Sequence, residues 1–222
     1  MIKVLMYVGI GTVAMLFPMM FVTWKYGIKL WKSIPIALYA ALAGTISTYL
    51  WFVVENQRFG GISFFGAVFL VPLAFFCTTK LFRESFGDLM DIFAPGICMM
   101  LAVMKVQCVL AGCCGGRAIF ETVNAEIIKF PSQIAELINA LVLCAVIMIL
   151  AYRPKLRGTL YPWYMVLYGI TRFILNFFRD EWGYGTIPYG TMWSAVAIAL
   201  GTTWLILSKK KHSGERVKEI YE

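Results

Sequence analysis

Charged residues are scarce in this chain of 222 residues, and their scarcity argues against an ordinary soluble domain. Only 14% of the residues are Asp, Glu, Lys or Arg, whereas a typical soluble domain carries about 25%. Hydrophobic residues make up 60% of the chain, and the mean hydropathy is +0.76. The composition therefore predicts a polytopic membrane protein without a soluble module.

Histidine is almost absent, which limits metal binding and acid–base chemistry. The one histidine, His212, lies in the basic C-terminal segment. Cys108, Cys113 and Cys114 follow no recognised zinc spacing, and no histidine is near them in the sequence. We therefore predict neither a metal site nor a cofactor.

Long apolar runs define the fold class, because a helix needs about 20 apolar residues to cross a bilayer. We predict an all-α fold in which residues 1–208 form a single helical transmembrane domain and residues 209–222 form a basic cytoplasmic tail. About seven helices are expected, at residues 2–23, 34–54, 62–79, 88–114, 132–151, 160–178 and 189–208.

Basic residues gather in alternate connections, which predicts the orientation. The segments after the first, third and fifth predicted helices, together with the C-terminal tail, hold most of the 20 basic residues. By the positive-inside rule, the N-terminus lies outside and the C-terminus in the cytoplasm. The net charge of +8 is then explained by these loops, and no nucleic-acid partner is expected.

Unusual polar residues from distant parts of the chain are predicted to converge on the outer leaflet. An arginine inside a span costs at least ~2.5 kcal/mol unless it is paired or hydrated. Arg172 and Asn176 are four residues apart and Arg179 follows three later, which predicts one shared helical face. The converging set is Lys105, Gln133, Glu136, Arg172, Asn176 and Arg179.

The roles of these charges have alternative interpretations. Arg172 can form a structural pair with Glu136 that ties the fifth and sixth helices together, or it can bind a lipid phosphate. Lys105 is either a second buried cation or extends outward along the membrane interface. Arg179 is either part of the same site or an interfacial anchor.

Four segments, in order between about residues 60 and 195, resemble the bacterial prolipoprotein diacylglyceryl transferases. Residues 130–140, FPSQIAELINA, resemble their P-[ST]-Q-x-x-E segment, and residues 161–181 resemble their Y-G-x-x-R-F…E-F-x-R segment. Residues 60–70 lie where the family carries S-x-H-G-G. Residues 104–118 lie where it carries the signature G-R-x-G-N-F-x-N-x-E-x-x-G.

The resemblance implies an enzyme at the outer face of the bacterial cytoplasmic membrane. Such an enzyme transfers diacylglyceryl from phosphatidylglycerol to the lipobox cysteine in the signal peptide of a prolipoprotein. The transfer forms a thioether and releases glycerol phosphate, as a step in lipoprotein biosynthesis. Both substrates are therefore expected partners of this multi-pass membrane protein.

The resemblance also implies site residues. Arg172 matches the arginine of the Y-G-x-x-R segment and Lys105 stands at the arginine of the signature, so both are predicted to be catalytic. The predicted substrate-binding residues are Tyr168, Arg179, Gly116, Gln133, Glu136, Gly66 and Asn176.

Several positions depart from the family pattern and support an alternative. Phe65 stands where the family has its histidine, and Lys105 lacks the planar fork with which an arginine binds phosphate. Cys108, Ala111 and Cys113 replace the Asn, Asn and Glu of the signature. The alternative is a paralogue that binds phospholipid or peptide without catalysis, or that acts on an altered substrate.

Overall fold

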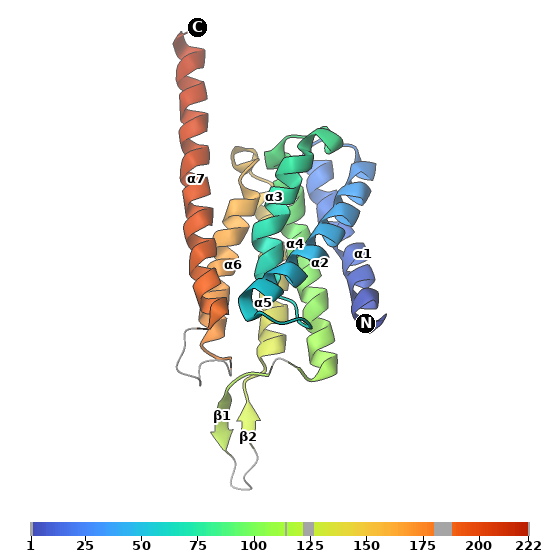
Figure 1. Ribbon diagram of the computed structural model, residues 1–222. Coiled ribbons are helices and arrows are strands. Elements are labelled where there is room, and N and C mark those ends of the chain that lie inside the picture. The colour runs from blue at the N-terminus through green and yellow to red at the C-terminus, as the bar shows by residue number, and fades with distance from the viewer. Residues whose placement is uncertain (1, 114, 122–126, 180–187, 222) are drawn as a thin grey trace.

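The computed structural model describes residues 2–113, 115–121, 127–179 and 188–221, and these residues form a helical bundle (Figure 1). This confirms the predicted helical class. The helices are α1 (Ile2–Lys25), α2 (Ser33–Asn56), α3 (Phe64–Phe82), α4 (Phe86–Ala111), α5 (Ser132–Leu150), α6 (Leu160–Asn176) and α7 (Tyr189–Tyr221). Two single turns of 3₁₀ helix lie between them, η1 (Leu30–Lys32) and η2 (Pro154–Leu156).

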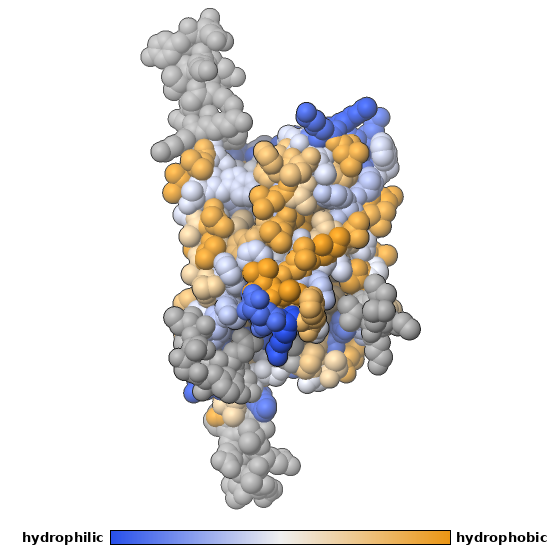
Figure 2. Space-filling model, viewed as in Figure 1, coloured by the Kyte–Doolittle hydropathy of each residue, from blue (hydrophilic) through white to orange (hydrophobic). Residues whose placement is uncertain are grey.

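Six of the described helices are long and apolar enough to cross a membrane. The exception is α6, which has 17 residues and ends two residues before the predicted limit of 178. Large apolar side chains such as Phe17, Leu42 and Leu110 are exposed on the outside of the bundle. Figure 2 shows hydrophobic residues across the middle of one face. Such a surface suits lipid contact, because apolar side chains face the hydrocarbon and each helix satisfies its own backbone hydrogen bonds without water.

Helix α4 forms the centre of the bundle and packs against α1 and α5, while α2 pairs with α3 and α6 with α7. Residues 88–98 of α4 are all buried. Gly96 lets α1 approach, because a Cβ added there would lie 2.8 Å from the sulfur of Met19. Small residues permit this close packing of helices in membranes.

Helix α4 ends at Ala111, three residues before the predicted limit of 114. The next residue, Gly112, adopts a left-handed conformation with φ of 63°, and its amide N–H bonds to carbonyl groups of the last turn. Glycine adopts this conformation without steric cost and is the usual residue just past a helix end. At the other end of α4, the Ser85 side chain accepts a hydrogen bond from the Asp88 amide at 3.0 Å.

A two-stranded antiparallel hairpin extends from the bundle after α4 and was not predicted. Its strands are β1 (Ala118–Glu121) and β2 (Ile127–Lys129), and Figure 1 shows it projecting beyond the helix ends. The β-branched and aromatic residues Ile119, Phe120, Ile127 and Ile128 were the available signal. We call this side of the bundle the hairpin end.

The opposite side, here called the basic end, carries Lys25, Lys80 and Arg157. The two chain termini lie at different ends of the bundle, with the C-terminus beyond the basic end (Figure 1). The predicted tail continues helix α7 as far as Tyr221. Which end faces the cytoplasm stays a prediction, and the positive-inside rule assigns the basic end to it.

A buried carboxylate anchors the start of α6 at the basic end. Asp91 of α4 accepts hydrogen bonds from the Tyr26 hydroxyl at 2.6 Å and from the amides of Gly158 and Leu160 at 2.5 and 2.8 Å. Burial and the adjacent Asp91 raise the pKa of Tyr26 well above its ordinary value, so the phenol stays protonated. This network joins the loop after α1 to α4 and to the start of α6.

Arg157 closes the same network from outside. It donates to both oxygens of Asp88, from Nε at 2.7 Å and from Nη2 at 3.1 Å, and its guanidinium lies over the Tyr26 ring. The bidentate bond to Asp88 raises the pKa of Arg157. These bonds hold the last residues of the loop before α6 and the first residue of α6 against α4.

Candidate functional site

A buried carboxylate surrounded by three cations lies toward the hairpin end of the bundle. Lys105 Nζ lies 2.6 Å from Glu136 Oε2, and Arg179 Nη1 donates to Glu136 Oε1 at 2.8 Å. Arg172 Nη1 makes the third ion pair, with Glu136 Oε2. The Glu136 side chain is 5% exposed, and the three cations are between 12% and 14% exposed. We call this group the cation cluster.

Three helices bring these residues to the same level. Lys105 lies within two turns of the end of α4, Glu136 lies in the second turn of α5, and Arg172 lies one turn before the end of α6. Arg179 follows α6, where its amide bonds to the Asn176 carbonyl at 3.1 Å. The cluster therefore depends on the ends of three separate helices.

The cluster carries an excess of positive charge. Three cations share one carboxylate, so the formal sum within it is two positive charges. Arg172 Nε is buried and has no hydrogen-bond acceptor among the described residues. Buried charges require partners, and the excess charge and the unused donor suit an anionic ligand with oxygen acceptors.

The structure shows which protein group each cation contacts, and a pair of Arg172 with Glu136 leaves phosphate binding by Arg172 possible as well. Arg172 does pair with Glu136, which ties α5 to α6. Lys105 is a buried second cation and does not extend outward. Arg179 is held by Glu136 and is more than an interfacial anchor. One carboxylate therefore organises all three cations.

Gly116 and Gln133 shape the backbone next to the cluster and make no described contact with Glu136. Gly116 forms an isolated antiparallel bridge with Arg179, and a Cβ added to it would lie 2.2 Å from the Phe130 carbonyl oxygen. Gln133 Nε2 donates to the Cys113 carbonyl at 2.5 Å. Both residues thus connect the end of α4 and the hairpin to the segments that present Arg179 and Glu136.

Asn176 and Gly66 lie apart from the cation cluster. Asn176 Nδ2 donates to Thr191 Oγ1 of α7 at 3.4 Å, and the predicted helical face of Arg172 and Asn176 does not continue to Arg179. The reason is that α6 ends at Asn176 and the chain turns before Arg179. Gly66 permits close packing of α3 on α2, since a Cβ there would lie 2.1 Å from the Ser47 carbonyl oxygen.

Tyr168 lies one turn before Arg172 on α6 and belongs to an aromatic layer. Its ring centroid is 5.8 Å from that of Phe65 and 5.6 Å from that of Phe64. Phe65 is itself buried and stacks on Phe69 at 5.9 Å. At the position where the resemblance leads one to expect a histidine, the chain therefore offers an apolar ring and no base.

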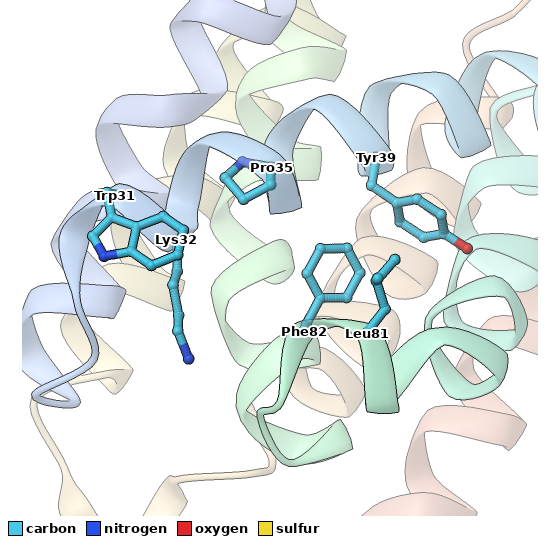
Figure 3. A pocket seen from close by; sticks show the side chains of 6 residues that line it. All are labelled: Trp31, Lys32, Pro35, Tyr39, Leu81 and Phe82. Carbon is cyan, nitrogen blue, oxygen red and sulfur yellow. The ribbon is translucent and has the colours of Figure 1, made fainter.

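A separate cavity lies at the basic end, away from the cluster. It has a volume of about 380 Å³ and lies between η1, the start of α2 and the end of α3 (Figure 3). Its walls are mainly apolar, and Lys32 is paired with Glu84 at 2.5 Å. The lining residues are Trp31, Lys32, Pro35, Tyr39, Leu81 and Phe82. The cavity therefore lacks the excess charge that marks the cation cluster.

Comparison with known proteins agrees with this arrangement. Residues 2–207 match the family model described as prolipoprotein diacylglyceryl transferase. The chain belongs to that family. The match covers every residue of the cation cluster and both strands of the hairpin.

Similar proteins carry the name phosphatidylglycerol–prolipoprotein diacylglyceryl transferase. The one from Dehalococcoides mccartyi is 26% identical over 68% of this chain and 63% of its own length. The one from Idiomarina loihiensis is 26% identical over 82% of this chain and 75% of its own length. The one from Mannheimia succiniciproducens is 27% identical over 69% and 62%. The chain thus spans less than two thirds of the first and third relatives.

Two structural features near the cation cluster were not predicted from the sequence. One is the hairpin, whose base includes the hydrogen bond from the Arg117 amide to the Phe178 carbonyl at 2.8 Å. The other is the bridge between Gly116 and Arg179. The glycine of the signature and the last arginine of the second motif are therefore backbone partners, although 63 positions separate them.

Proposed function

We propose that this chain transfers the diacylglyceryl group of phosphatidylglycerol to the lipobox cysteine of a prolipoprotein. The site would lie at the outer face of the bacterial cytoplasmic membrane. Membership of the family and the names of the relatives support the proposal. The observation that carries it is that the two cations Lys105 and Arg172 are buried against the single carboxylate of Glu136.

The charge excess matches the charge that develops in this reaction. The phosphodiester of phosphatidylglycerol has one negative charge, and a second forms as glycerol phosphate leaves. Cations held in a site of low dielectric stabilise that developing charge without reorganising. Binding is then stronger in the transition state than in the ground state, as catalysis requires.

Arg172 and Lys105 are assigned the phosphate in this proposal. The Nε donor of Arg172 has no acceptor among the described residues, and the planar guanidinium can donate to two phosphate oxygens at once. Lys105 supplies a second charge as a compact ammonium group. Glu136 and Arg179 position them, since Glu136 contacts all three cations.

The sulfur of the lipobox cysteine attacks the glycerol carbon next to the phosphate. The carbon–oxygen bond breaks, a carbon–sulfur bond forms, and glycerol phosphate leaves with the electron pair. The thiol first loses its proton to solvent water, and nearby cations favour the thiolate by lowering the pKa of the cysteine. With Phe65 in the aromatic layer, we assign this activation to the field of the cation cluster.

The test is complementation of a strain depleted of its transferase, with the mass of a lipobox peptide as the readout. We expect the wild-type chain to add the mass of diacylglyceryl and Arg172→Ala to abolish the addition. Lys80→Ala is the matched control, because Lys80 is an exposed cation at the basic end. Turnover by Arg172→Ala at the wild-type rate would remove Arg172 from its role.

Phospholipid binding without transfer is the second candidate function, and Phe65 is the observation that favours it. Under this alternative, the inserted protein binds phosphatidylglycerol at the cation cluster, and the lipobox peptide keeps its mass. Measuring lipid binding and peptide mass on the same preparation separates the two functions.

A further inference from the structure

Two partly buried tryptophans carry indole N–H groups without a hydrogen-bond acceptor among the described residues. The Nε1 atoms of Trp51 on α2 and Trp193 on α7 are both buried. Indole nitrogen can only donate. A donor without an acceptor in the hydrocarbon region is costly, so a bound molecule that supplies an acceptor would be favoured here.

The two tryptophans form one unit that bridges two parts of the bundle. Their ring centroids are 4.9 Å apart in an edge-on arrangement. Both also contact Phe69 of α3, at 5.4 Å for Trp51 and 6.0 Å for Trp193. Helices α2, α3 and α7 therefore meet here through aromatic rings.

The pair lies at the level of the cation cluster. Two neighbours of Trp193 on α7 contact α6. Thr191 accepts a hydrogen bond from Asn176, and the carbonyl oxygen of Ser194 would lie 2.8 Å from a Cβ added to Gly169. The interval from Gly169 to Asn176 on α6 includes Arg172. From the other side, Phe69 stacks on Phe65, which contacts Tyr168. The indoles therefore lie at about the same depth in the bundle as Arg172, with the rings of Phe65 and Phe69 between them and Tyr168.

The chemistry of the acceptor follows from the surroundings. The rings around the two N–H groups are apolar, and the charged groups described at this level include the cations of the cluster and Glu55, one turn after Trp51 on α2. A phospholipid whose phosphate lies at the cluster places its two acyl ester carbonyls a short distance further along the same molecule. Ester carbonyls accept hydrogen bonds and donate none, and tryptophan favours this boundary between polar and apolar layers.

We propose that Trp51 and Trp193 bind the ester carbonyls of the diacylglycerol part of the lipid held at the cation cluster. The inference rests on the proposed phospholipid site and adds a basis for selecting diacyl over dialkyl lipids. Each indole donates one hydrogen bond to a carbonyl oxygen. The two tryptophans thus position the glycerol carbons relative to Arg172.

The test compares two lipids that differ only at the proposed contact. Purified full-length protein in neutral-lipid nanodiscs is titrated with phosphatidylglycerol carrying ester-linked chains and with its ether-linked analogue, which lacks the carbonyls. A hydrogen bond contributes about 1 kcal/mol, which corresponds to roughly fivefold in affinity. Wild-type protein is expected to bind the ester lipid about five- to twentyfold more tightly than the ether lipid.

Substitution of the donors should remove this preference. Trp51→Phe and Trp193→Phe keep an aromatic ring and delete the N–H, so each should weaken ester-lipid binding about fivefold and leave ether-lipid binding unchanged. Trp204→Phe is the matched control, because Trp204 lies toward the other end of α7 and stacks on Phe86. Thermal unfolding without added anionic lipid checks folding, and both variants should match the wild type there.

Three binding outcomes would overturn the inference. Equal binding of both lipids by the wild type, or equal weakening of both by the two variants, would mean that the indoles do not read the carbonyls. Failure of folded wild-type protein to bind either lipid would overturn the phospholipid site as well. Ester-selective binding with no transfer to a lipobox peptide would support the inference and overturn the transfer reaction alone.

Discussion

Glu136 is the residue on which the charge arrangement depends. Lys105, Arg172 and Arg179 all contact this one carboxylate, and all four side chains are largely buried. Without it, three cations would repel one another in a medium of low dielectric. Because each oxygen of Glu136 already contacts a cation, a further ligand would bind through Arg172, whose Nε has no acceptor among the described residues.

Replacing Glu136 should therefore destabilise the fold. We expect Glu136→Gln to lower the free energy of unfolding by about 3–5 kcal/mol, because removal of one partner leaves buried charges uncompensated. Unfolding in detergent measures the loss. Glu84→Gln is the control, since the pair of Glu84 with Lys32 is more exposed and should contribute about 1 kcal/mol or less. Equal losses in the two variants would contradict the central role of Glu136.

At the scale of the element, α6 is positioned by close contact with α7. Gly169 faces α7, where a Cβ would lie 2.7 Å from the Ile198 side chain and 2.8 Å from the Ser194 carbonyl oxygen. Two helices in a membrane pack closely where a small residue lets the backbones approach. The position of Arg172, less than one turn further along α6, depends on this contact.

An added methyl group at Gly169 should separate the two helices. We expect Gly169→Ala to lower the free energy of unfolding by about 1–3 kcal/mol, because a backbone carbonyl has no room to yield. Gly44→Ala in α2 is the control, since its nearest neighbouring atom would be 3.9 Å away. It should gain about 0.5–1 kcal/mol from the better helix propensity of alanine. A neutral result for Gly169→Ala would argue against tight packing of α6 on α7.

The hydrogen bonds of Asp91 to Tyr26 and to the loop before α6 also position this helix. We expect Tyr26→Phe to lower the free energy of unfolding at neutral pH by about 1.5–3 kcal/mol, since it removes a hydrogen bond to the Asp91 carboxylate. Tyr152→Phe is the control, because Tyr152 is exposed at the same end. A result for Tyr26→Phe equal to that of the control would exclude a stabilising role for the bond.

This contribution should also depend on pH. Burial and Asp91 raise the pKa of folded Tyr26 above its unfolded value of about 10. Below about pH 10 both states hold the phenolic proton, and the stabilisation is complete. Above it the unfolded state alone loses the proton, so stability should fall as pH rises. The difference between wild type and Tyr26→Phe should shrink accordingly between about pH 10 and 11, and a constant difference would contradict the raised pKa.

At the scale of the whole molecule, function depends on which end faces outward. The cation cluster and hairpin are at one end, and most basic loops are at the other. The positive-inside rule places the hairpin end outside. A lipobox cysteine on the outer face would then meet the cluster directly.

Accessibility of introduced cysteines should show this orientation. In a version without the six native cysteines, Ala118→Cys in the hairpin is expected to react with a membrane-impermeant thiol reagent in intact cells. Ser213→Cys in the C-terminal part of α7 should react only after the cells are opened. Labelling of Ser213→Cys in intact cells would reverse the predicted topology.

Much of the architecture follows from the sequence, because crossing a bilayer imposes a strong local requirement. Apolar runs of about 20 residues can satisfy their backbone groups only as helices. The sequence at the end of α4 also carries a local signal, because Gly112 takes the left-handed conformation that favours glycine just past a helix end. The depth of Lys105, Glu136 and Arg172 followed from their distances to the helix ends, so their meeting at one level was predictable.

The contacts themselves required the tertiary structure. In a soluble protein, the apolar face of a helix shows which side is buried, but lipid-facing and core-facing sides are both apolar in a membrane. The hydrophobic pattern therefore does not show which helix each polar side chain contacts, and the hydrogen bond of Asn176 to Thr191 of α7 was not predicted. The convergence of three cations on Glu136, and the pairing of Trp51 with Trp193, follow from helix rotations that only packing between distant segments determines.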